Sequence, residues 1–118
     1  MKSHLLSQPV AKVIFWLLFL AVILGAVMPQ SNSPQLFALA DKVVHTVAFL
    51  VLTLVGLRAY PSKVLVMAVV LIALGGLIEI LQGYTSTRSQ EWEDFLADIL
   101  GVGLGILLAK QLWPEKQT

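Results

Sequence analysis

Four long apolar segments, separated by short polar turns, limit most strongly what this chain can fold into. They run from Val13 to Met28, from about Val43 to Leu57, from Val64 to Leu81 and from about Phe95 to Leu112. With their flanking residues they approach the roughly 20 residues that a membrane-spanning helix needs. Lipid offers no hydrogen-bond partners to the backbone, so spanning segments of this kind are helical. The sequence therefore predicts an all-α membrane protein, a bundle of four transmembrane helices with short loops.

Two local signals near the first turn refine this prediction. Ser33 followed by Pro34 is a favourable helix start, so we expect a short interfacial helix over Pro34–Ala40 before the second span. The tripeptide Ala38-Leu39-Ala40 has the small residues of a signal-peptide cleavage site. It lies far beyond the end of the first apolar segment, whereas cleavage follows the apolar region closely. We therefore expect the first segment to remain as a transmembrane helix.

The composition supports the membrane class and excludes others. Of the 118 residues, 58% are hydrophobic and 13% are charged, whereas about a quarter of the residues of a soluble domain are charged. The length fits one domain over residues 1–118. The net charge of +1 argues against a nucleic-acid partner, which requires a clustered basic surface. The absence of cysteine excludes disulfides and thiolate metal sites.

Basic residues predict the orientation of the chain, because cytoplasmic loops are enriched in Lys and Arg. If the N-terminus lies inside, only Lys42 and Arg88 fall outside. The remaining basic residues then fall in the cytoplasm: Lys2, Lys12, Arg58, Lys63, Lys110 and Lys116. We therefore expect an inner-membrane protein with both termini in the cytoplasm. Of these residues, Lys12, Arg58, Lys63 and Lys110 are expected to extend to the inner headgroups.

Carboxylates are predicted at the opposite, outer face. Glu91 and Glu93 fit solvated loop residues, but Glu79 and Asp98 lie inside the outer ends of the third and fourth spans. A carboxylate within a span is costly and indicates a functional site by default.

Helical spacing arranges several of these residues in stripes. Asp94 and Asp98 are four residues apart and share a helix face, which continues through Gly101 and Gly105. Glycines at this spacing allow a neighbouring helix to approach closely. The inward face of the fourth helix is therefore predicted to carry two carboxylates above a flat packing surface.

The ordered polar motifs resemble those of the VanZ-like family, small multi-pass membrane proteins named for a protein associated with teicoplanin resistance. The motifs are Lys42-Val43-Val44-His45, Glu79-Ile80-Leu81-Gln82, Arg88, and Asp94-Phe95-Leu96-Ala97-Asp98 followed by Gly101 and Gly105. The resemblance covers about Asp41 to Gly105. It implies a role in the bacterial cell envelope and a link to antibiotic resistance, but no particular reaction. The family pattern usually has Asn at the position of Asp98, so the extra acid could change the charge of the site or share a proton with Asp94.

Seven polar residues are predicted to converge at the outer leaflet as a ligand-binding site: Lys42, His45, Glu79, Gln82, Arg88, Asp94 and Asp98. The leading hypothesis is binding of an envelope lipid or a glycopeptide-related ligand, because Lys and Arg could hold a phosphorylated head. One alternative is an enzyme that acts on a phosphorylated lipid-linked cell-wall intermediate, with His45 as general acid or base; its catalytic residues stay unknown. The other is a structural or interaction subunit in which the polar network fixes helix register.

No metal or cofactor is expected from the sequence. His45 with Glu79, Asp94 and Asp98 would form a hard-donor set suited to Mg²⁺ or Ca²⁺. A lone His on a spanning helix, however, is more often a hydrogen-bonded polar residue than a ligand. The expected partners are membrane lipids, a lipid-linked or glycopeptide ligand, and a second copy of the chain packed through Gly101 and Gly105.

Overall fold

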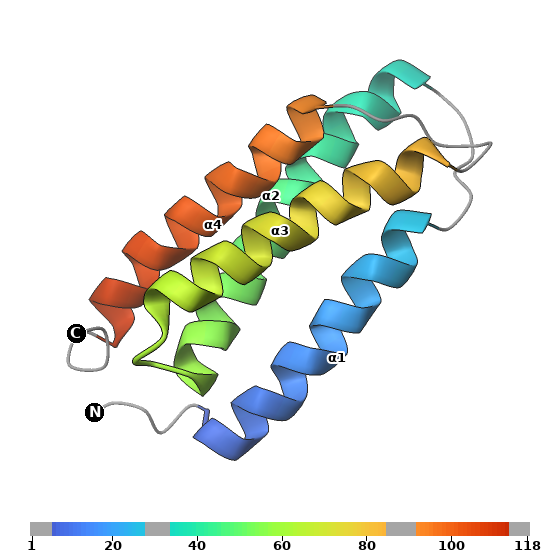
Figure 1. Cartoon of the computed structure of the whole chain (residues 1–118). Coiled ribbons are helices and arrows are strands. Elements are labelled where there is room, and N and C mark those ends of the chain that lie inside the picture. The colour runs from blue at the N-terminus through green and yellow to red at the C-terminus, as the bar shows by residue number, and fades with distance from the viewer. Residues whose placement is uncertain (1–5, 28–33, 85–91, 114–118) are drawn as a thin grey trace.

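The computed structural model describes residues 6–27, 34–84 and 92–113, and this part of the chain forms four helices (Figure 1). They are α1 (Gln8–Val27), α2 (Pro34–Ala59), α3 (Val64–Gly83) and α4 (Trp92–Leu112). Each helix is long and apolar enough to cross a membrane. The predicted all-α fold with four spanning helices is confirmed.

The second helix is longer than the sequence suggested. Instead of a separate interfacial helix over Pro34–Ala40, α2 continues without a break from Pro34 to Ala59 and has 26 residues. No glycine or proline lies between Pro34 and Gly56, so nothing interrupts the backbone hydrogen bonds. At 1.5 Å per residue α2 is about 39 Å long, longer than a hydrocarbon core of roughly 30 Å. It therefore tilts or extends beyond the hydrocarbon region.

The bundle has an apolar surface and a partly polar interior. Large apolar side chains such as Leu17, Leu65 and Leu107 are more than 60% exposed, as expected for residues that face lipid. Buried positions include the polar side chains of Thr53 and Gln82. A protein that spans a membrane places its polar residues in this way, because they face the bundle interior and not the lipid tails.

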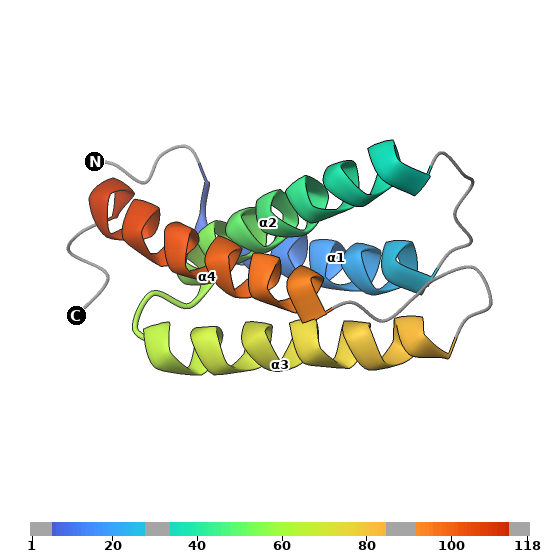
Figure 2. The same cartoon turned by 90° about the horizontal axis from the view of Figure 1, so that it is seen from above.

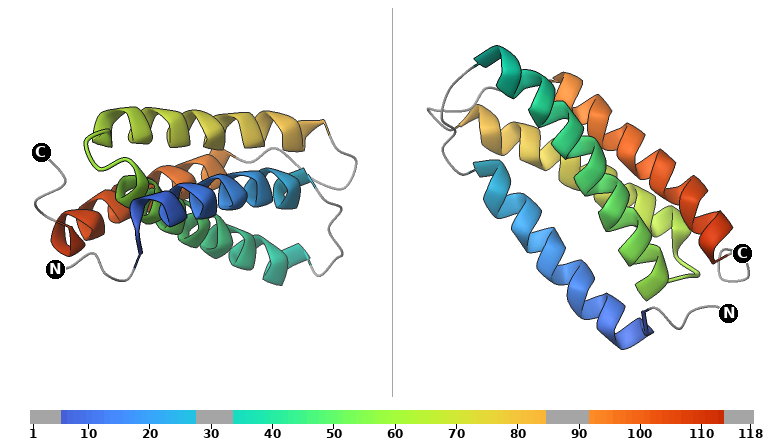
Figure 3. Two further views of the ribbon diagram at one scale, coloured as in Figure 1. Left: turned by 90° about the horizontal axis from the view of Figure 1, so that it is seen from below. Right: turned by 180° about the vertical axis from the view of Figure 1, so that it is seen from behind.

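The two ends of the bundle differ in which helices begin and finish there. At one end, called here the polar end, α2 and α4 begin and α1 and α3 finish; at the other, called the basic end, α1 and α3 begin. In Figure 2, α2 and α3 lie on opposite sides of the bundle with α1 and α4 between them. The right view of Figure 3 shows α1 and α4 apart, with α2 between them. Helix α2 packs against all three other helices, and most extensively against α4.

Two glycines allow α4 to approach α2 closely. A Cβ atom at Gly101 would collide with the backbone carbonyl oxygen of Thr46, and one at Gly105 would lie 2.6 Å from Thr53 Cβ. The glycine stripe that was predicted to admit a neighbouring helix therefore contacts α2 of the same chain. Self-association of the chain through these glycines stays a prediction, and it would require α2 to give up this contact.

Arg58, at the basic end, differs from expectation. The sequence predicted that it would extend to the lipid headgroups, but it is only 7% exposed. Its Nε donates a hydrogen bond of 2.6 Å to the carbonyl oxygen of Leu6, which precedes α1. Lys12 instead lies near the aromatic residues of this end, with its Nζ 5.2 Å from the centroid of the Tyr60 ring. The headgroup-anchor prediction is therefore wrong for Arg58.

Candidate functional site

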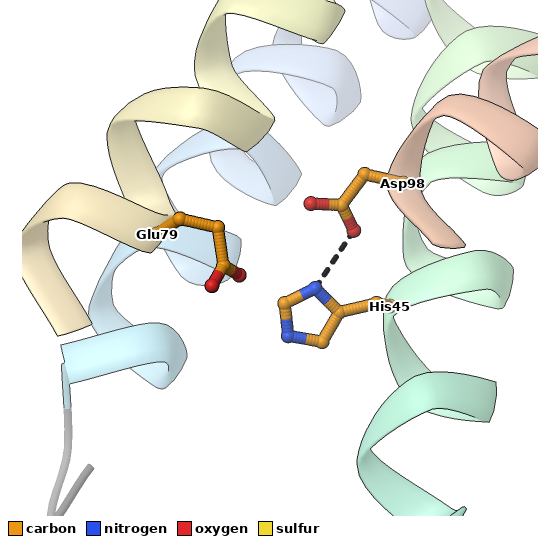
Figure 4. A group of neighbouring side chains, drawn as sticks. All are labelled: His45, Glu79 and Asp98. Carbon is orange, nitrogen blue, oxygen red and sulfur yellow. Dashed lines mark hydrogen bonds and ion pairs between the residues drawn. The ribbon is translucent and has the colours of Figure 1, made fainter. Parts of the chain in front are cut away.

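Three polar side chains from three different helices meet at the polar end. They are His45 of α2, Glu79 of α3 and Asp98 of α4 (Figure 4). One nitrogen or oxygen atom from each lies within 4.8 Å of those from the other two. His45 is 8% exposed, and Glu79 and Asp98 are fully buried. Together these residues are called here the triad.

The shortest contact in the triad joins His45 Nδ1 and Asp98 Oδ1 at 2.7 Å. A distance this short requires a proton between the two atoms and is typical of a charge-assisted hydrogen bond. In Figure 4 the imidazole ring and the carboxylates of Asp98 and Glu79 lie at the corners of a triangle, and the dashed line joins His45 to Asp98. Asp98 therefore orients the ring. Sharing of a proton between Asp98 and Asp94, the possibility raised by the sequence, stays a prediction.

Glycines in the spanning helices set the spacing of the triad. A Cβ atom at Gly75 of α3 would lie 2.9 Å from Asp98 Oδ2, so the absence of a side chain at Gly75 makes room for this carboxylate. Glu79 follows Gly75 by four residues and therefore lies on the same face of α3. On α4, Gly101 follows Asp98 by three residues, and a Cβ there would lie 3.0 Å from Phe49 Cβ of α2. The sequence thus brings α4 close to both neighbours at the level of Asp98.

A second polar link joins α2 and α4 one turn nearer to the start of each helix. Lys42 Nζ lies 3.4 Å from Asp94 Oδ1 and 3.8 Å from Glu93 Oε1. The Asp94 side chain is only 3% exposed, whereas that of Lys42 is 32% exposed and that of Glu93 is 75% exposed. The contacts Lys42–Asp94 and His45–Asp98 therefore connect α2 to α4 at two successive helical turns.

Gln82, on α3, connects to the remaining helix. Its Nε2 donates a hydrogen bond of 3.1 Å to the carbonyl oxygen of Ala26, in the last turn of α1. The last four carbonyl groups of a helix lack partners within the helix, so this amide caps the end of α1. The contact gives Gln82 a structural role in addition to its place beside the triad.

An apolar pocket adjoins the triad between α1, α2 and α3. Its volume is about 290 Å³, and His45 and Gln82 are its polar lining residues. Val44, which also lines it, is 59% exposed, so the pocket reaches the surface of the bundle. The remaining lining is apolar: Leu18, Ala21, Val22, Gly25, Ala26, Ala48, Phe49 and Ile78. Sequence reasoning did not identify this pocket, although small residues at Ala21 and Gly25 are a signal for it.

Nearly the whole chain, including the triad and the Lys42–Asp94 contact, falls within one family model. The model described as VanZ/LLP1 matches residues 3–113. The chain belongs to the VanZ/LLP1 family. The resemblance seen in the polar motifs is therefore confirmed, and the family name fits an envelope protein with a link to antibiotic resistance. No curated protein and no solved structure matches the chain.

In this VanZ/LLP1 protein the structure brings most of the predicted site residues to one end. Lys42, His45, Glu79, Gln82, Asp94 and Asp98 all lie at the polar end. Arg88 lies outside the described residues. Chemically, the arrangement offers an imidazole that is hydrogen-bonded to one carboxylate and near a second, a partly exposed ammonium group, and an apolar pocket beside them.

Proposed function

We propose that this VanZ/LLP1 protein binds an envelope lipid at the outer leaflet of the bacterial inner membrane. The observation that carries the proposal is the pocket between α1, α2 and α3, which is apolar along its length and polar at His45 and Gln82. A lipid has the same division between apolar chain and polar head. The orientation, with both termini in the cytoplasm, is supported by the basic residues that flank the spans.

The size of the pocket favours a lipid over a glycopeptide-related ligand. Small-molecule sites usually have volumes of about 300 to 1,000 Å³, so about 290 Å³ suits one segment of a hydrocarbon chain. A glycopeptide is far larger, and its many polar groups would meet an almost wholly apolar lining.

Lys42 is the cationic group that a phosphorylated headgroup would meet, and it is shared with Asp94 and Glu93. Lys42 lies one turn from His45 toward the start of α2, and its side chain is 32% exposed. An ammonium group at headgroup depth attracts phosphate, and the hydrogen-bonding atoms of His45 and Gln82 lie beside the apolar lining. In the proposed complex the phosphate faces Lys42 and the hydrocarbon chain extends into the pocket.

Two glycines provide a matched test. Gly25 lines the pocket, and a Cβ there would have no atom within 4 Å. Gly103, on α4, has the same open surroundings but does not line the pocket. Gly25→Leu should fill the pocket without displacing its walls, whereas Gly103→Leu adds the same side chain elsewhere.

The measurement is native mass spectrometry of the purified full chain with a polyprenyl phosphate, and with phosphatidylglycerol in parallel. We expect the wild type and Gly103→Leu to retain lipid, and Gly25→Leu to lose about tenfold or more in affinity, or roughly 1.4 kcal/mol. Preference for one of the two lipids would identify the headgroup class. Equal retention by Gly25→Leu and Gly103→Leu would show that lipid does not occupy the pocket.

A second candidate function is favoured by the hydrogen bond between His45 and Asp98. A histidine oriented by a carboxylate is a common general base, so the site could hydrolyse a lipid-linked phosphate, with His45 taking the proton of the attacking water. Release of inorganic phosphate from a polyprenyl pyrophosphate, lost in His45→Asn, would support this enzyme. Lipid binding without phosphate release would leave the binding function alone.

A further inference from the structure

We propose that the triad of His45, Glu79 and Asp98 binds a divalent transition-metal ion such as Mn²⁺ or Zn²⁺. The three side chains come from three helices, their ligand-type atoms lie within 4.8 Å of one another, and all three are buried. This proposal departs from the sequence-based expectation that no metal binds. It does not depend on lipid binding in the neighbouring pocket.

The donor set selects the class of ion. Carboxylate oxygens suit Mg²⁺, Ca²⁺ and Mn²⁺, whereas imidazole suits Zn²⁺ and its transition-metal neighbours. A set with one imidazole and two carboxylates therefore favours an ion that accepts both kinds of donor. Three protein ligands also leave a coordination position for water, as in zinc sites that carry out chemistry.

The geometry needs only side-chain movement to hold such an ion. Ligand atoms about 2.1 Å from a metal lie roughly 3.0 to 3.4 Å from one another. His45 Nδ1 and Asp98 Oδ1, now at 2.7 Å, would separate by less than about 1 Å. Any pair at the 4.8 Å limit would close by at most about 1.8 Å, which rotation of the Glu79 side chain supplies. The triad is thus near a coordinating arrangement while the helices stay in place.

The charge of the donor set also suits a dication. Glu79 and Asp98 supply two carboxyl groups at membrane depth, where such groups indicate a function by default. A divalent ion is attracted to carboxylate ligands.

The packing around the triad brings the two carboxylates together. Asp98 packs directly against Gly75 of α3, since a Cβ there would lie 2.9 Å from Asp98 Oδ2. Glu79 follows Gly75 by four residues on the same face of α3, so α3 and α4 present their carboxylates to one space.

The direct test adds Mn²⁺ alone to the metal-free full chain in detergent and counts bound ions by electron paramagnetic resonance. We expect one bound Mn²⁺ per chain, and coupling to a ligand nitrogen that changes when the histidines carry ¹⁵N. Glu79→Gln and Asp98→Asn keep the shape of each side chain and should each weaken binding by about tenfold or more. Glu93→Gln removes an exposed carboxylate at the same end and is the control that should bind Mn²⁺ like the wild type.

One further readout keeps the proposal falsifiable if a variant fails to fold. Gly25→Leu should bind Mn²⁺ normally even if it loses lipid, which separates this proposal from the proposed lipid binding. The absence of bound Mn²⁺ at about 1 mM, a very weak affinity, would overturn the metal site, as would binding that lacks nitrogen coupling.

Discussion

Replacing Gly105 with alanine should destabilise the bundle, whereas the same substitution at Gly103 should not. The two glycines lie in the same helix, α4, two residues apart. A Cβ at Gly105 would lie 2.6 Å from Thr53 Cβ and 3.0 Å from the Leu50 carbonyl oxygen, but at Gly103 nothing lies within 4 Å. The pair therefore compares one added methyl group inside the α2–α4 contact with one outside it.

The size of the effect follows from these distances. Carbon atoms in contact normally lie about 3.5 to 4.0 Å apart, so Gly105→Ala must push α2 and α4 apart by about 1 Å. Overpacking of this kind costs about 1 to 3 kcal/mol. Gly103→Ala has no such cost and gains up to about 1 kcal/mol of helix propensity. The two variants should therefore differ in free energy of unfolding by about 1 to 4 kcal/mol.

The measurement is unfolding of the purified protein by titration with sodium dodecyl sulfate, followed by circular dichroism. Gly105→Ala should unfold at a lower detergent fraction than the wild type, and Gly103→Ala at the same fraction or a higher one. Equal stability of the two variants would refute the close packing of α2 on α4. It would also contradict the short hydrogen bond between Asp98 and His45, which depends on the close approach of these two helices.

Three other predictions follow from the structure and the charge pattern. In intact spheroplasts, a cysteine at Ser86 should react with a membrane-impermeant thiol reagent and one at Ser62 only after permeabilisation; the reverse would place the polar end in the cytoplasm. Asp98→Asn preserves a polar partner for His45 and should leave the free energy of unfolding nearly unchanged, whereas Asp98→Leu should lower it by about 1 to 3 kcal/mol. Equal losses in the two variants would show that the hydrogen bond does not stabilise the bundle. Arg58→Leu should cost a similar amount in the same detergent titration, and no loss would mean that the arginine does not hold the segment before α1.

The four helices were predictable because lipid leaves the backbone of a long apolar segment only one hydrogen-bonded solution. The segment predicted to begin at Val64 and end at Leu81 corresponds to α3, which continues to Gly83. The gathering of polar residues at one end was also predictable, since the second, third and fourth helices each carry them near the same predicted membrane face.

The partners of individual side chains were less predictable. Spacing along one helix shows which residues share a face, but not which helix lies opposite, so the pair His45–Asp98 required the structure. Arg58 was misjudged because the headgroup-anchor rule treats each helix alone, whereas here the backbone at Leu6 comes within 2.6 Å. The pocket beside Gly25 was missed for the same reason, because it depends on how far α1 stands from α2 and α3.

The contact between α2 and α4 also sets an order for biosynthesis. Asp98 follows His45 by 53 residues, so at roughly 5 to 20 residues per second the ribosome makes it about 3 to 10 seconds later. Until α4 is inserted, His45 and Glu79 reside in the bilayer without the helix that completes their surroundings. A chain truncated before Trp92 would therefore keep these two polar side chains in the bilayer without the helix that carries Asp98, at the cost that polar groups have there.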